Sequence, residues 1–153
     1  MGVDYGRKYL GLALASGWDN NGSPLVVPLP ALIFESSGQV LVELLETCKQ
    51  YSVEDIVFGL PMLPNGMEGG LSKEIRIFSR KLLVNAEKEK GLRLGIHFAD
   101  ERLTSFEAGA VARGIKKTRE GKRKLENSLA ACLILRNFLD LDPKFTKDQS
   151  QNH

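Results

Sequence analysis

The sequence predicts an α/β protein built on one mixed sheet, and two observations carry this prediction. Short apolar runs separated by polar turns fill the first third of the chain, which indicates an antiparallel meander of strands. Beyond residue 35, apolar patterns of helical spacing alternate with short β-rich runs. That succession is typical of parallel strands joined by right-handed crossovers. We therefore expect antiparallel and parallel pairs in the same sheet.

The meander is the first part of this sheet. A first strand precedes the turn glycine Gly6, and a polar loop from Gly17 to Ser23 separates the other two strands. The three expected strands cover residues 2–5, 9–16 and 25–34.

Helices and strands are expected to alternate from there. Leu41, Leu44, Leu45 and Cys48 share one helix face, and Pro61 ends a buried strand over residues 55–60. A helix over 71–89 and a strand over 92–98 follow. The Thr104-x-x-Glu107 pattern predicts a helix start, and Leu129–Leu139 predicts a buried final helix that begins near Glu126 and Asn127.

Length and composition fit one globular domain. The 153 residues are 42% hydrophobic and 26% charged, enough for one complete core, which we expect over residues 1–142 with a polar tail at 143–153. The two cysteines, far apart in apolar patterns, indicate reduced thiols and a cytoplasmic protein. No apolar run is long enough to suggest a membrane partner. Because the first strand begins almost at Met1, an upstream presequence removed from a longer precursor would instead indicate an organelle.

Carboxylates are expected to end several of these elements. Asp4 ends the first strand, Asp100 and Glu101 end the last one, and Glu126 is expected at the start of the final helix. Hard cations such as Mg²⁺ prefer oxygen ligands, and metal-assisted attack on a phosphodiester needs carboxylates that converge from separate elements. From composition alone, turn chemistry explains Asp4 better than a catalytic role does, and a solvated strand end paired with Arg102 is the better explanation of Asp100-Glu101.

Positive charge is concentrated in one segment, although the net charge is only +2. The stretch from Arg113 to Lys124 carries seven cations against one acid, which predicts a flexible arm that contacts phosphates; a merely solvated loop is the alternative. Phosphate contacts position a strand without reading its sequence. The residues expected to bind nucleic acid are Arg7, Lys8, Arg102, Lys116, Lys117, Lys122, Arg123 and Lys124.

Four motifs in series resemble one known family. GVDYGRKYLGLALA, DIVFGLP, ADERLTSFEA and NSLAACLIL, spread over about residues 2–139, are similar to the YqgF/RuvX family, Holliday-junction-resolvase-like proteins also regarded as pre-16S rRNA nucleases. The resemblance implies a ribonuclease-H-like fold, a mixed five-stranded sheet with its first three strands antiparallel and flanked by helices. It also implies catalytic, metal-binding acids, which map onto Asp4 and onto Asp100-Glu101, with Glu101 preferred.

The chain departs from this family pattern at Asn127. Such families usually place an aspartate before Ser-x-Ala-Ala, so Asn127 would be a weakened third catalytic and metal ligand, with an amide oxygen but no charge. Glu126 would replace it only from a frayed first helical turn. The alternative is that Asn127 caps the helix.

The resemblance implies a nuclease for structured RNA that acts in pre-16S rRNA processing and uses Mg²⁺ or Mn²⁺, as a monomer or weak homodimer. Two alternatives remain open. A resolvase for branched DNA would need a dimer to make two symmetric cuts. A catalytically impaired RNA-binding or ribosome-assembly factor would explain Asn127.

Overall fold

The computed structural model describes residues 1–101 and 117–141, and these contain a five-stranded sheet of order β3-β2-β1-β4-β5. β1 pairs with β2, and β2 with β3, in antiparallel fashion, whereas β4 lies parallel to both β1 and β5. The expected mixed sheet, with its first three strands antiparallel, is confirmed. The strands are β1 Gly2–Tyr5, β2 Tyr9–Trp18, β3 Pro24–Ile33, β4 Asp55–Leu60 and β5 Gly95–Asp100.

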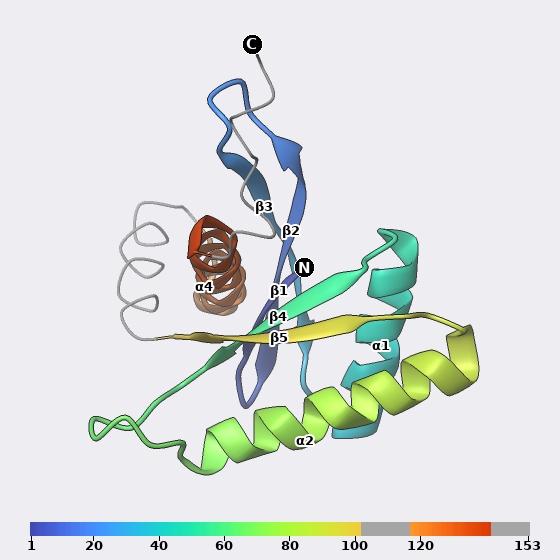
Figure 1. Cartoon of the computed structure of the whole chain (residues 1–153). Coiled ribbons are helices and arrows are strands. Elements are labelled where there is room, and N and C mark those ends of the chain that lie inside the picture. Colours follow the sequence, from blue (N-terminus) through green and yellow to red (C-terminus); the bar gives the residue numbers. More distant parts are fainter. Residues whose placement is uncertain (102–116, 142–153) are drawn as a thin grey trace.

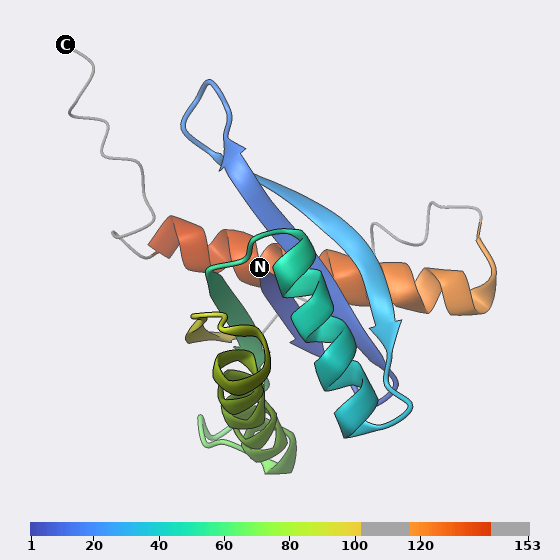
Figure 2. The same ribbon diagram turned by 90° about the vertical axis from the view of Figure 1, so that its right-hand side faces the viewer.

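Helices cover both faces of this sheet (Figure 1). α1 (Ser37–Gln50) and α2 (Gly70–Asn85, continued by the π-helical turn η1, Ala86–Lys90) lie on one face, and α4 (Arg119–Leu141) lies on the other. Figure 2 shows α4 running across β2 and β3. None of the helices in the described part of the chain is both long and apolar enough to cross a bilayer.

Each face has its own core. Val3, Leu10, Leu44, Phe58 and Phe78 belong to the larger cluster, between the sheet and helices α1 and α2. The smaller cluster lies under α4 and is built from smaller strand residues; it contains Ala13, Val57, Ala131, Ile134 and Leu135. α4 comes close to the strands because small residues face it: an added Cβ at Gly2 would lie 2.5 Å from the carbonyl oxygen of Ala131.

The junction between β2 and β3 is irregular. Between Leu10 and Leu12 on β2 there is one residue, Gly11, but the partners of those two leucines on β3, Leu32 and Leu29, are separated by two residues. The extra residue makes a β-bulge at Pro30 and Ala31, a place where a sheet tolerates proline because a ladder hydrogen bond is already missing.

The start of the final helix differs from the sequence-based expectation. α4 begins at Arg119, about two turns before Glu126, so Arg119–Lys124 are helical and not part of a flexible arm. The hydroxyl of Thr118 accepts a hydrogen bond from the amide of Gly121 at 3.1 Å, which caps this earlier start. β5 begins at Gly95 and not at residue 92. The helix start expected at Thr104–Glu107 lies outside the described residues.

Candidate active site

One row of residues crosses the α4-facing side of the sheet where β1 and β4 end. Asp4 on β1 pairs with Gly11 on β2, and Gly11 lies opposite the bulge of β3. On the other side, Phe58 pairs with Val3, so the next residue of β4, Gly59, lies beside Asp4. Glu101 follows directly after β5 and donates its amide hydrogen to the carbonyl of Leu60 at 3.1 Å.

The side chains of Asp4 and Glu101 meet across β4 and share a hydrogen bond. The two strands that carry these acids are not neighbours, because β4 separates β5 from β1. The two acids meet because Gly59 has no side chain. An added Cβ at Gly59 would lie 3.3 Å from the carboxyl carbon of Glu101 and 2.5 Å from Cδ1 of Ile134.

Both carboxyl groups are easier to protonate than free carboxyls. Burial raises the pKa of Asp4, a residue that is only 9% exposed. Burial also raises the pKa of Glu101, and the hydrogen bond to Asp4 and the negative charge of Asp4 add to this. Two hydrogen-bonded carboxyls this close share one proton and titrate as a pair. A bound cation would replace that proton and remove the repulsion between the two carboxylates.

Asn127 stands over this row from α4. A Cβ added to Gly11, the strand partner of Asp4, would collide with the backbone carbonyl oxygen of Asn127. It would also lie 2.9 Å from the Cβ of Asn127. The side-chain nitrogen of Asn127 donates to the carbonyl of Arg123 at 3.0 Å, one helical turn earlier. Asn127 therefore lies in the interior of α4, and the alternative that it caps the helix is wrong. Glu126 also lies beyond the first turn, so the frayed position that it would need does not exist.

Some of the predicted basic residues gather beside this end of the sheet. Lys8 and Lys124 both lie over the ring of Tyr9, with their ammonium nitrogens 5.3 and 5.9 Å from the ring centroid. Lys124 also pairs with Glu120 at 3.2 Å. These contacts bring cations from the β1–β2 turn and from α4 to the same ring, which lies two residues along β2 from Gly11, the strand partner of Asp4.

The remaining predicted cations divide into three groups. Arg7 is exposed in the β1–β2 turn, and Lys117 is exposed just before α4. Lys122 and Arg123 lie on the first turns of α4. Arg102 and Lys116 lie outside the described residues.

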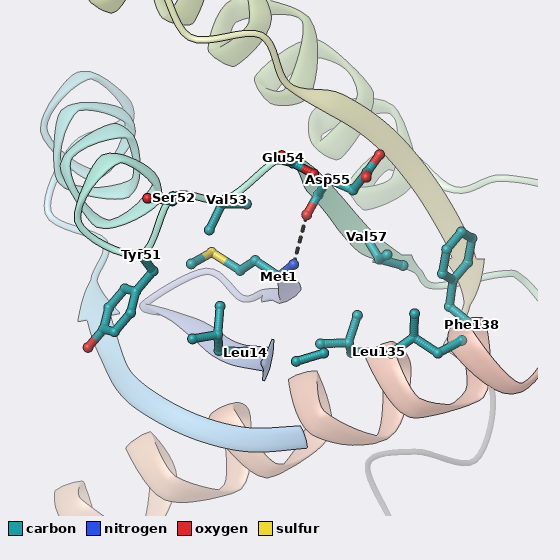
Figure 3. A pocket seen from close by; sticks show the side chains of 12 residues that line it. Met1, Leu14, Tyr51, Ser52, Val53, Glu54, Asp55, Val57, Leu135 and Phe138 are labelled. Atoms are coloured by element: carbon teal, nitrogen blue, oxygen red, sulfur yellow. Dashed lines mark hydrogen bonds between the residues drawn. The ribbon is translucent and has the colours of Figure 1, made fainter. Parts of the chain in front are cut away.

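A separate cavity of about 240 Å³ lies at the opposite end of β1. Figure 3 shows its lining, which is mostly apolar, and the amino group of Met1, which donates to the carbonyl of Asp55 at 2.7 Å. Nearby, a ring nitrogen of His97 shares a hydrogen bond with the carboxyl group of Asp55 at 2.7 Å. Because neither Asp4 nor Glu101 lines this cavity, its chemistry is distinct from that of the acid pair.

We compared the chain with known proteins to find its family. A family model described as "RuvX: Holliday junction resolvase" matches residues 1–141. The chain belongs to the RuvX family.

Named relatives of this RuvX chain are similar over nearly their full length. A "Putative pre-16S rRNA nuclease" of Moorella thermoacetica is 35% identical over 142 residues, which cover 92% of this chain and 93% of the relative. A protein of the same name from Syntrophomonas wolfei is 32% identical over 142 residues, with 92% of each covered. A solved structure of RuvC from Thermus thermophilus aligns with a TM-score of 0.48 and 13% identity, over 90% of this chain and 95% of that one. The RuvX match therefore supports a nuclease- or resolvase-like protein.

The donor set suits a hard cation but is small. Within residues 1–101 and 117–141, no three or more His, Cys, Asp and Glu side chains gather where they could hold a metal ion. Asp4 and Glu101 would hold a divalent ion as two carboxylates, and Asn127, whose backbone packs against Gly11, would offer a further amide oxygen from α4. Sequence reasoning missed Gly59 and Gly11, which make room for these groups, since only the packing of Ile134 and Asn127 against them reveals their role.

Proposed function

We propose that this RuvX chain is a metal-dependent endonuclease that cuts phosphodiester bonds in structured RNA during pre-16S rRNA processing. The observation that carries the proposal is the Asp4–Glu101 pair at the C-terminal ends of β1 and β5, with Lys8 and Lys124 over Tyr9, two residues along β2 from the strand partner of Asp4. Buried, proton-sharing carboxyls favour a cation partner, and nearby ammonium groups favour a phosphate. The names of the relatives favour pre-16S rRNA as the substrate.

Each side chain has a role in this proposal. Asp4 and Glu101 hold Mg²⁺ or Mn²⁺, with Asn127 as a weakened third ligand. The bound ion would neutralise charge on the phosphate and lower the pKa of a bound water. Lys8 and Lys124 hold phosphates next to the scissile bond, and Arg7, Lys122 and Arg123 extend the positive surface. The buried floor of Gly11 and Gly59 keeps bulk water away from the carboxyl pair.

The direct test is cleavage of an end-labelled RNA that carries the stem and single-stranded ends of a 16S precursor. We expect cleavage in Mg²⁺ or Mn²⁺, none in excess EDTA, and none with Asp4→Asn under any condition. A four-way DNA junction of matched length serves as the competing substrate. Undiminished cleavage in EDTA, or an active Asp4→Asn protein, would contradict the proposed chemistry.

Two other functions have specific support. The description of the matching family model favours a junction resolvase, and preferential, symmetric cutting of the DNA junction would establish it. The hydrogen bond of Asn127 to Arg123 favours a catalytically impaired RNA-binding factor, because the amide nitrogen is engaged within α4 and the side chain brings no charge. Tight RNA binding without cleavage in any divalent ion would establish that function.

A further inference from the structure

A groove of about 440 Å³ lies between β3 and the first turns of α4, outside the acid pair. This volume is within the range of about 300–1,000 Å³ typical of ligand sites. One wall is a single face of α4 and the residues just before it, and the other is the bulged part of β3. The lining residues are Pro28, Leu29, Pro30, Ala31, Lys117, Gly121, Lys124, Leu125 and Ser128.

The two walls are chemically different. The β3 wall is apolar, and its bulge at Pro30 and Ala31 turns the strand out of the regular ladder. The α4 wall carries Lys117 and Lys124, of which Lys124 also pairs with Glu120. Ser128 fixes the distance between the walls, because its buried hydroxyl donates to the carbonyl of Leu29 at 2.7 Å. The groove is therefore a preformed channel with a cationic side and an apolar side.

We propose that this groove binds a single-stranded RNA segment that flanks the cleaved stem. An unpaired nucleotide has an anionic backbone on one side and the apolar face of a base on the other, which matches the two walls. A duplex hides its base faces and offers nothing to the prolines and Leu29. None of the described residues that line the groove has an amide, carboxyl or guanidinium group that could pair with a base edge, so we expect it to hold unpaired bases without selecting their sequence.

The groove is connected to the candidate active site. Lys124 lines the groove and also lies over the ring of Tyr9, which Lys8 contacts as well. The bulge lies opposite Gly11, which pairs with Asp4, so groove and acid pair are at two ends of the same row across the sheet. A strand in the groove therefore passes along Lys124 toward Asp4. This inference rests on the proposed function for the identity of the nucleic acid.

The test is equilibrium binding of labelled RNA hairpins in EDTA, so that cleavage plays no part. One hairpin has a blunt stem, and the other has the same stem with a single-stranded flank of uridines. The variants are Lys117→Gln, which removes one cation, and Ala31→Glu, which places a charge on the apolar wall. Lys81→Gln, an exposed change on α2 at the opposite face, is the matched control. Melting temperatures confirm that each variant is folded.

We expect the flank to tighten wild-type binding and Ala31→Glu to lose most of that gain while it binds the blunt hairpin as before. Lys117→Gln should weaken binding of the flanked hairpin more than binding of the blunt one. Lys117→Gln should also lower the salt slope for the flanked hairpin by about 0.7. Equal losses for the two hairpins, or no tightening by the flank, would overturn the proposal. If no RNA is ever cut but the flank preference and its loss persist, the groove assignment is supported and the proposed nuclease function fails.

Discussion

Glu101 reaches Asp4 across an intervening strand, and the two carboxyls share a hydrogen bond over Gly59. The contact joins residues 97 positions apart in the chain, so it depends on the register of β1, β4 and β5. The position of this carboxyl pair therefore depends on Gly59 and Ile134, which carry no reactive group themselves. That dependence can be tested without altering either acid.

Gly59→Ala should displace the side chain of Glu101 from Asp4. The new methyl group would lie 2.5 Å from Cδ1 of Ile134 and 3.3 Å from the carboxyl carbon of Glu101, so both side chains must move. Overpacking of this kind costs about 1–3 kcal/mol of unfolding free energy. Ile134→Val removes Cδ1, so the double variant should regain much of the stability while cleavage stays reduced. Urea unfolding and cleavage rates measure the two effects separately; equal recovery of both would show that Glu101 is not displaced.

Asp4→Asn should abolish cleavage without destabilising the protein. At neutral pH the proton-sharing pair still carries one buried negative charge, and an amide at position 4 removes the desolvation cost of that charge. We expect unfolding free energy to rise by about 0.5–2 kcal/mol, or a few degrees in melting temperature. Exposed Asp140→Asn on α4 is the matched control and should change neither property. A large loss of stability in Asp4→Asn would mean that the ionised pair holds the fold together.

The stability of the metal-free protein should fall as pH rises. Because the pKa values of Asp4 and Glu101 are raised above the ordinary values of 3.8 and 4.5, the folded state binds protons more tightly than the unfolded state. This contribution is fully present below the ordinary values and is lost as pH rises through the raised ones. Urea midpoints should therefore decline toward alkaline pH, less steeply in Asp4→Asn. Mn²⁺ should reverse the decline, and its affinity should increase with pH as the shared proton is released.

Asn127→Asp should strengthen metal binding. The carboxylate cannot donate to the carbonyl of Arg123 as the amide does, and it adds a third anionic oxygen donor over Gly11. We expect Mn²⁺ affinity to rise about 10-fold or more and cleavage to increase, as measured by calorimetry and by initial rates.

Glu126→Gln is the neighbouring control for Asn127→Asp. Glu126 lies well inside α4, so its loss should change metal affinity little. Strong damage from Glu126→Gln would identify Glu126 as the third ligand. An Asn127→Asp protein with unaltered metal affinity and no cleavage would instead support the RNA-binding factor.

The strand pattern of this fold was readable from the sequence because it depends on local alternation. Residues 2–5 and 55–60 were placed correctly, and the parallel pairing followed from the intervening helices. The start of α4 was misplaced because a cluster of cations around Gly121 resembles a loop. Thr118, followed by Glu120 in the first turn, was the available signal for a helix start.

The site was only partly predictable for a different reason. Asp4 and Glu101 could be named as candidates from strand ends and from family motifs, and the structure brings them together. The reason that they meet could not be derived, because it lies in the empty space over Gly59 and in the packing of Ile134. A glycine inside a strand signals close approach in general but does not say which residue approaches.

The prolines of β3 also affect the behaviour of many copies of the chain together. β3 is an outer strand with exposed Leu25 and Val27, a combination that invites strands of other molecules to add to the sheet and aggregate. Pro24, Pro28 and Pro30 remove three of its ten amide donors, and the bulge bends what remains. A strand of another molecule that added to β3 would therefore lack hydrogen-bond partners along this edge. The residues that shape the groove wall thus also protect the molecule from self-association while it is concentrated or newly synthesised.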